Sequence, residues 1–209
     1  MITINPFSEL SEFIPSIAMQ VYVIAMVVLV AGGTILDMAH KQSAKFFFRN
    51  SEKAKKLATN PVGAGEKASI ALKTIAEDVL TSGEFCNTKR RIAHLLTMYG
   101  FVLFVSTTAI MIFCYASITS VTPSILPLLW HIGALMLCVG GYWFWFFIRV
   151  DVAVEGNPWY RVVRADLFIL SLLATATFGL IWSYFQTSNV SGWDTLFFVL
   201  FILFMLLML

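Results

Sequence analysis

Five long apolar runs divide this chain of 209 residues and limit what it can fold into. Four are long enough to cross the hydrocarbon core of a bilayer as helices, which takes about 20 residues; they are 16–36, 92–117, 126–148 and 167–185. The fifth run, 195–209, reaches roughly 22 Å as a helix and falls short of the ~30 Å core. This shortfall favours a native chain that continues past Leu209 over a final helix that thins the bilayer.

The composition agrees with a membrane protein, because only 12% of the residues are charged and 59% are apolar. A soluble surface needs more charge than that. The sequence therefore predicts an all-α integral membrane bundle of five transmembrane helices, forming a single domain over 1–209.

The basic residues predict the orientation of this bundle. Of the fourteen Lys and Arg residues, eleven lie between Lys41 and Arg91, and the other three, Arg149, Arg161 and Arg164, flank the loop between the third and fourth runs. Because positive charge stays on the cytoplasmic side, we expect 37–91 and 149–166 inside and the N-terminus outside. For a bacterial chain this means a multi-pass protein of the inner membrane with a periplasmic N-terminus. Aromatic residues near the run ends are expected to mark the interfaces, with Trp130, Trp182 and Trp193 outside and Trp159 and Tyr160 inside.

The basic cytoplasmic loop 37–91 contains two segments with their own patterns. DMAHKQSAKFFFRNSEKAKK, from Asp37, combines cations with three phenylalanines and predicts an interfacial segment near anionic headgroups. EKASIALKTIAEDVL, from Glu66, has apolar residues at helical spacing and predicts a short amphipathic helix. That helix either lies on the membrane or the bundle, or it docks a cytoplasmic partner.

Three histidines are the first candidate site residues, since polar groups in or beside a bilayer span are costly and imidazole is a common haem ligand. His40 and His94 lie at the inner side, whereas His131 lies near the outer side, roughly 20 Å from His94 in depth. His94 and His131 thus cannot share one iron. A haem at His94 needs His40 or a histidine beyond Leu209 as its second ligand. The alternatives are a headgroup-zone position for His40 and His94, and for His131 a hydrogen bond to a neighbouring helix.

The inner mouth of the bundle supplies further candidates. We expect Asp166 to pair with Arg164, Arg90 or Arg91, or alternatively to pass a proton to quinone. The run YWFWFF from Tyr142 is typical of lipid-facing or core aromatics, with a nearby quinone pocket as the alternative. The sequence lacks a nucleotide-binding glycine loop, a catalytic triad and a metal-binding carboxylate cluster, and its three cysteines have no metal-ligand spacing. Soluble redox chemistry would belong to a partner, and nucleic acid is not an expected one.

Two stretches resemble a known family. FCNTKRRIAHLLTMYGF (85–101) and EGNPWYRVVRADLFILSLLATATFGL (155–180) are similar to five-helix membrane subunits of the nitrate reductase gamma type. They resemble more closely the membrane anchors of adenylylsulfate reductase and of quinone-interacting membrane-bound oxidoreductases. The resemblance runs from about residue 16 to the end.

The resemblance implies electron transfer between quinone and a cytoplasmic iron–sulfur or flavin partner, often through haem b. His94 matches the family's histidine at the start of the second helix. Haem-binding members have two histidines on the second helix and two on the fifth, whereas this chain has one and none. The resemblance therefore implies a one-haem subunit or a haem-free anchor that still touches quinone.

The leading hypothesis is a membrane anchor and electron-transfer subunit, with His94 and His131 as candidate haem ligands and His40 as a further candidate. In it, Arg90, Arg91 and Asp166 shape the inner mouth. A cofactor-free structural anchor is the second hypothesis. A small transporter is the third, and the spans contain none of the mid-depth charges that transport usually needs.

Overall fold

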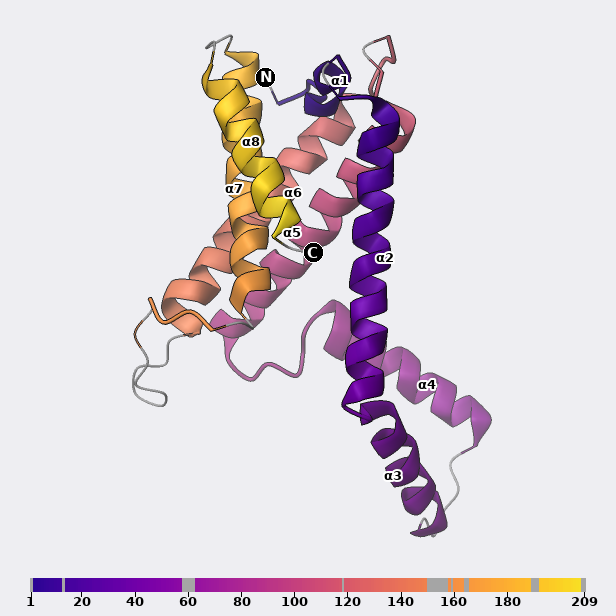
Figure 1. The fold of residues 1–209 in the computed structure, drawn as a ribbon. Coiled ribbons are helices and arrows are strands. Elements are labelled where there is room, and N and C mark those ends of the chain that lie inside the picture. Colours follow the sequence, from indigo (N-terminus) through magenta and orange to yellow (C-terminus); the bar gives the residue numbers. More distant parts are fainter. Residues whose placement is uncertain are drawn as a thin grey trace. The chain divides into compact units, whose positions relative to one another are not determined.

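The computed structural model describes residues 2–12, 14–57, 63–117, 119–149, 158, 160–163, 166–188 and 192–207. The regular secondary structure of these residues is helical, and none of them lies in a strand. The helices are α1 (Pro6–Leu10), α2 (Ser16–His40), α3 (Ser43–Leu57), α4 (Ala64–Thr74), α5 (Thr88–Cys114), α6 (Ile125–Trp143), α7 (Leu167–Thr187) and α8 (Trp193–Leu206). Two π-helical turns, η1 (Ile75–Leu80) and η2 (Phe144–Ile148), extend α4 and α6 (Figure 1). The predicted all-α fold is confirmed.

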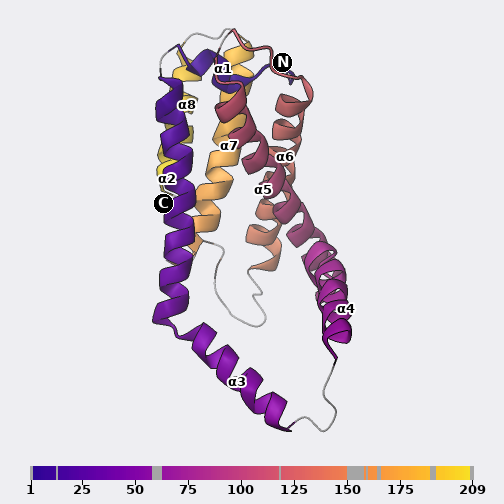
Figure 2. The same ribbon diagram turned by 90° about the vertical axis from the view of Figure 1, so that its right-hand side faces the viewer.

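Four of the helical segments are long and apolar enough to cross a membrane: Ser16–His40, Thr88–Cys114, Ile125–Ile148 and Leu167–Thr187. They overlap the first four predicted spans, and the largest differences are that the first helix ends four residues later and the second begins four residues earlier than predicted. α8 is a shorter apolar helix of 14 residues that packs beside α7 (Figures 1 and 2). The protein is therefore a membrane protein with four candidate spans.

The chain forms two compact units, one made of 1–23 with 85–209 and the other of 24–84. The first unit contains the packed helices α5 to α8 and the short helix α1. The second contains the rest of α2 together with α3, α4 and η1. The single domain expected over 1–209 stays a prediction.

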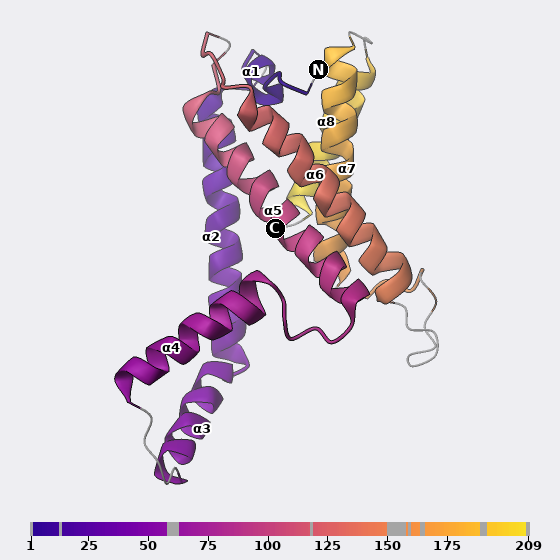
Figure 3. The same cartoon turned by 180° about the vertical axis from the view of Figure 1, so that it is seen from behind.

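The first unit is built around the close contact of α5 and α6, which run side by side in opposite directions (Figure 3). A Cβ at Gly100 would lie 2.5 Å from the Leu137 backbone nitrogen, and one at Gly133 would lie 2.7 Å from that of Phe104. A Cβ at Gly140 would lie 2.8 Å from the Ala93 carbonyl oxygen. Glycines thus let the two backbones touch along their length, as small residues do in membrane bundles.

An aromatic core fills the end of this unit that lies under α1. Trp130 is fully buried, and its indole N–H donates to the Thr108 hydroxyl at 2.9 Å. The Phe7 ring meets Trp130 edge-on at 6.0 Å and Trp182 at 5.9 Å. Trp130 and Trp182 were expected at the outer lipid interface, and this is wrong. Their rings are buried because Phe7 of α1 packs on both of them and Phe198 and Phe201 of α8 also pack on Trp182. Trp193 is 53% exposed, and Trp159 lies outside the described residues.

Hydrogen bonds hold α1 over that core. The Asn5 side-chain amide donates to the Tyr115 carbonyl at 3.0 Å and to the Thr122 hydroxyl at 3.1 Å. The Gln186 amide donates to the Pro6 carbonyl at 3.2 Å. These bonds tie α1 to the segment after α5 and to the end of α7, so α1 closes one end of the unit. We call this the α1 end. We call the opposite end, where α5 begins and η2 ends, the basic end.

The second unit contains the predicted amphipathic helix. It is formed by α4 and η1, and its apolar side chains are exposed, among them Ile70, Leu72, Ile75 and Val79. The predicted interfacial segment forms the helix α3, with Phe46, Phe47 and Phe48 all exposed. Both segments therefore present apolar surface.

The glycine contact predicts that two Gly→Ala substitutions have very different effects on the free energy of unfolding. In Gly100→Ala the new methyl meets backbone of α6, which cannot move aside without separating the helices. Overpacking of this kind costs about 3 kcal/mol of unfolding free energy, to be measured by denaturant titration in detergent. Gly32→Ala, with open space around its Cβ among the described residues, should be neutral or stabilise α2 by up to about 1 kcal/mol. Equal stability of the two variants would contradict the α5–α6 contact.

Candidate functional site

A cavity of about 680 Å³ opens at the basic end of the first unit. Its walls come from the start of α5, from η2 and from the segment that leads into α7. The lining residues are Phe85, Arg90, Ala93, His94, Thr97, Gly141, Phe144, Ile148, Arg149, Arg161, Val163, Asp166 and Ile169. We call it the basic-end pocket. It contains three of the six residues expected at the site, namely Arg90, His94 and Asp166.

One face of α5 forms the first wall. Arg90, Ala93, His94 and Thr97 follow the i, i+3, i+4, i+7 spacing that places side chains on one helical face. The register of this face is set where the helix begins. The Asn87 side chain accepts hydrogen bonds from the Lys89 and Arg90 backbone N–H groups at 2.9 and 3.5 Å, as an N-cap does.

His94 and Arg90 supply the polar groups of this wall, and both are exposed to the pocket. The His94 ring lies 5.0 Å from the Phe85 ring, tilted by 43°. The Arg90 guanidinium has no ion-pair or hydrogen-bond partner in the part of the chain that the structure describes. The pocket thus combines an imidazole with an unneutralised guanidinium.

The π-helical turn η2 forms the second wall. The Arg149 N–H donates to the Phe144 carbonyl at 2.7 Å, five residues back rather than four. Such a turn shifts the helical face by one residue and is frequent at functional sites. Here it brings Phe144, Ile148 and Arg149 together on the pocket side. The YWFWFF run therefore contributes one ring, Phe144, to the pocket that contains His94.

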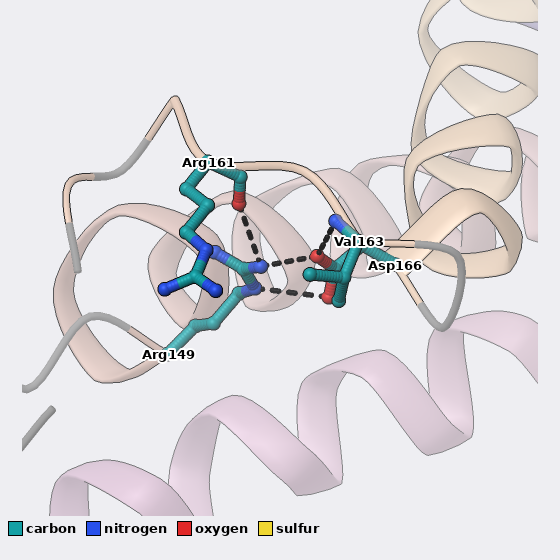
Figure 4. Close-up of polar contacts among 4 residues, drawn as sticks. All are labelled: Arg149, Arg161, Val163 and Asp166. Atoms are coloured by element: carbon teal, nitrogen blue, oxygen red, sulfur yellow. Dashed lines mark hydrogen bonds and ion pairs between the residues drawn. The ribbon is translucent and has the colours of Figure 1, made fainter.

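A two-point ion pair closes the third wall (Figure 4). The Arg149 Nε donates to Asp166 Oδ1 at 3.0 Å, and its Nη2 donates to Asp166 Oδ2 and to the Arg161 carbonyl. The Val163 N–H also donates to Asp166 Oδ2, at 2.8 Å. The Arg149 guanidinium further lies 4.1 Å from the centre of the Trp145 ring. Because both carboxylate oxygens accept charge-assisted bonds, the pair ties η2 to the start of α7.

The same contacts set the charge of Asp166. Burial alone would raise the pKa of its carboxyl group, but the hydrogen bonds from Arg149 and Val163 and the positive charge of Arg149 outweigh it. The pKa of Asp166 therefore lies below its ordinary value. Asp166 stays ionised at neutral pH.

The partner expected for Asp166 needs correction. Arg164 lies outside the described residues, and the carboxylate is bound by Arg149 rather than by Arg90 or Arg91. Arg91 is half-buried and does not line the pocket. Arg149 ends the third span and Asp166 begins the fourth, so opposite charges on the facing ends of consecutive spans were the signal that could have identified this pair.

His131 lies outside the pocket, and both of its ring nitrogens are hydrogen-bonded. Nδ1 is 2.7 Å from the Pro127 carbonyl oxygen, which can only accept, so Nδ1–H is the donor. Nε2 is 2.9 Å from the Ser183 hydroxyl, which donates to it when the ring is neutral. This is the arrangement of a histidine that joins α6 to α7. His131 also lies nine positions before Gly140, which packs on Ala93, and this is a rise of roughly 14 Å. It thus lies far from the level of His94, although the separation along the helix is smaller than the roughly 20 Å expected from the sequence.

These positions test whether the residues fit a haem. Among the residues that the structure describes, the pocket lining includes one histidine, no cysteine and no methionine. Iron at His131 would have to displace Ser183. His40 belongs to the second compact unit. The described residues of the first unit therefore do not fit a haem that is held by two protein ligands.

Comparisons with known proteins do not identify the ligand of this pocket. No protein-family model matches the chain, and no curated protein or solved structure matches it either. What the pocket binds is therefore inferred from its own side chains.

The Arg149–Asp166 pair predicts an acid-dependent stability. Because the pKa of Asp166 is lowered by folding, the unfolded chain takes up the proton first as the pH falls. The stabilisation is complete above the ordinary carboxyl pKa of about 4 and disappears as the pH falls through the lowered value. Asp166→Asn should lower the unfolding free energy at pH 7 by about 2 kcal/mol, the order expected for hydrogen bonds to a charged group, and should remove this part of the acid dependence.

The measurement is thermal unfolding in detergent between pH 3 and 7. Glu77→Gln is the matched control, since the Lys73–Glu77 pair is 4.0 Å long and exposed and such pairs contribute little. An Asp166→Asn variant that unfolds like the Glu77→Gln variant at every pH would show that the ion pair does not join η2 to α7.

Proposed function

We propose that this protein is the membrane subunit of a redox complex and that it binds a quinone headgroup in the basic-end pocket. Electrons would pass between that quinone and an iron–sulfur or flavin partner at the cytoplasmic face, such as an adenylylsulfate reductase. The observation that carries the proposal is the placement of His94, Arg90 and Phe144 around one cavity at the end of the bundle.

The size and composition of the pocket support a flat organic ligand. Its volume of about 680 Å³ is within the usual range for small-molecule sites, roughly 300–1,000 Å³. Aromatic and aliphatic walls from Phe85, Phe144, Ile148 and Ile169 surround a few polar groups. A quinone ring needs such walls for its faces and hydrogen-bond donors for its two carbonyl oxygens.

His94 and Arg90 are the donors that we assign to the quinone oxygens. Reduction of a quinone to the quinol takes up two electrons and two protons, and oxidation releases them. An imidazole has one nitrogen that can donate a proton and one that can accept it, so His94 can pass those protons between the ring oxygen and water. The Arg90 guanidinium stays charged and would stabilise negative charge on the ring oxygen.

Asp166 has a positioning role in this proposal. Its lowered pKa and its bonds to Arg149 keep it ionised, so it is a poor proton carrier. It holds Arg149 and η2 in place, and η2 in turn presents Phe144 to the pocket. The proton exchange is therefore assigned to His94 rather than to Asp166.

The proposal includes a five-span topology, with α8 completing the bundle and the basic end inside. The basic-end pocket is lined by Arg90, Arg149 and Arg161, and Arg91 lies in the first turn of α5. The positive-inside rule places such an end in the cytoplasm. The N-terminus would then be periplasmic in a bacterial inner membrane. Since the donor set does not suit a haem with two protein ligands, we propose quinone contact without one.

Binding of a short-chain quinone to the purified protein tests the function. Wild type should bind it in calorimetric titrations in detergent, and His94→Ala should weaken binding about tenfold, which is roughly 1.4 kcal/mol for one lost hydrogen bond. Arg90→Ala should weaken binding by a similar factor. Lys89→Ala is the matched control, because it removes a neighbouring cation that does not line the pocket.

Two results would contradict the proposal. Equal losses in Arg90→Ala and Lys89→Ala would indicate general electrostatics rather than a site. Absence of quinone binding by a folded wild-type protein would instead support the cofactor-free anchor, in which the bundle only holds its partner at the membrane.

A further inference from the structure

The second compact unit carries a different cluster of positive charge, at the junction of α2 and α3. α2 ends at His40, and α3 begins at Ser43 after two residues. Gln42 adopts a positive φ of 51°, which non-glycine residues rarely take. This conformation interrupts the helix, and α3 leaves the end of α2 at an angle (Figures 1 and 2).

Three cations line a hollow at this junction. Lys45 and Arg49 lie four residues apart on α3 and therefore project from one side of it. Together with Lys41, Gln42 and Phe46 they line a cavity of about 500 Å³. The Arg49 guanidinium lies 5.9 Å from the centre of the Phe46 ring. No described residue in this lining has a carboxylate.

The acids near the hollow do not neutralise it. Asp37 pairs with Lys41 at 2.9 Å, and Glu52 is the one acid of α3. Lys45 and Arg49 have no ion-pair partner among the residues that the structure describes. Two cations thus remain available to an anion.

The position of the hollow along the chain favours a lipid as that anion. α2 is a 25-residue apolar helix, roughly 37 Å long, which exceeds the ~30 Å hydrocarbon core. Its last turn therefore reaches the headgroup layer. Beside the cations, Phe46 is 59% and Phe47 67% exposed. Cations next to exposed aromatic side chains are the pattern of a helix that lies in the membrane interface.

We infer that the α2–α3 junction is a binding site for the phosphate group of an anionic phospholipid. Lys45 and Arg49 would contact the phosphate oxygens, and Lys41 would join them when it leaves Asp37. Phe46 and Phe47 would enter the acyl boundary. This site belongs to the second unit and does not depend on the quinone pocket.

The test titrates dihexanoyl phosphatidylglycerol against the full-length protein in detergent, with dihexanoyl phosphatidylcholine and inorganic phosphate as separate arms. Each cation near a phospholipid headgroup contributes roughly a fivefold change in affinity. Lys45→Gln/Arg49→Gln should therefore weaken phosphatidylglycerol binding roughly 30-fold. Lys55→Gln/Lys56→Gln, which removes the same charge from the same helix outside the hollow, should change it less than about threefold, because salt screens distant charges.

A variant that is expected to bind more tightly separates an effect on the site from an effect on folding, because a misfolded protein would not gain affinity. Asp37→Asn removes the competing carboxylate from Lys41 and should strengthen phosphatidylglycerol binding about threefold. Circular dichroism should report equal helix content in all variants, since every substituted side chain is exposed.

Several outcomes would overturn the inference. Equal weakening by the two double variants would mean diffuse attraction rather than a site. Equal binding of phosphatidylcholine would remove the dependence on net headgroup charge, and phosphate binding as tight as that of phosphatidylglycerol would identify a free anion as the ligand. Absence of phosphatidylglycerol binding would indicate that these cations bind an acidic partner protein instead of a lipid.

Discussion

The backbone contact between α5 and α6 is the constraint on which the first unit depends. Gly100, Gly133 and Gly140 leave no room for a Cβ against the facing helix, so the two helices can pack in one register only. That register places Ala93 beside Gly140 and thereby brings the start of α5 next to the end of α6. The basic-end pocket exists because these two helix ends meet.

The arginines at the basic end have two different roles. Arg149 is bound by Asp166 and by the Arg161 carbonyl, so its charge is used to hold η2 against the start of α7. Arg90 lies across the same cavity without such a partner among the described residues, and its charge remains available to a ligand. Arg149 thus fixes one wall of the pocket, and Arg90 can bind a ligand. Such a pocket is suited to recognise an electron-rich oxygen.

Much of the fold could be predicted from hydrophobicity alone, because a long apolar run beside a bilayer has few structures open to it other than a helix. The positions of the first four long helices were predicted in this way, and that of the amphipathic helix α4–η1 from the helical spacing of its apolar residues. The ionic partner of Asp166 was not, since Arg149 lies seventeen positions away and becomes a neighbour only when α6 and α7 pack. The environment of His131 depends in the same way on Ser183 of α7.

By itself the sequence determined the helical class, the membrane character and which residues are costly to place near a bilayer, because these follow from local composition and period. It also singled out Arg90, His94 and Asp166. Only the tertiary structure decided that these three line one cavity with Phe144, that Trp130 and Trp182 are buried under α1, and that His131 is already hydrogen-bonded. Such facts depend on which helix faces pack together, and packing joins residues that no pattern along the chain connects.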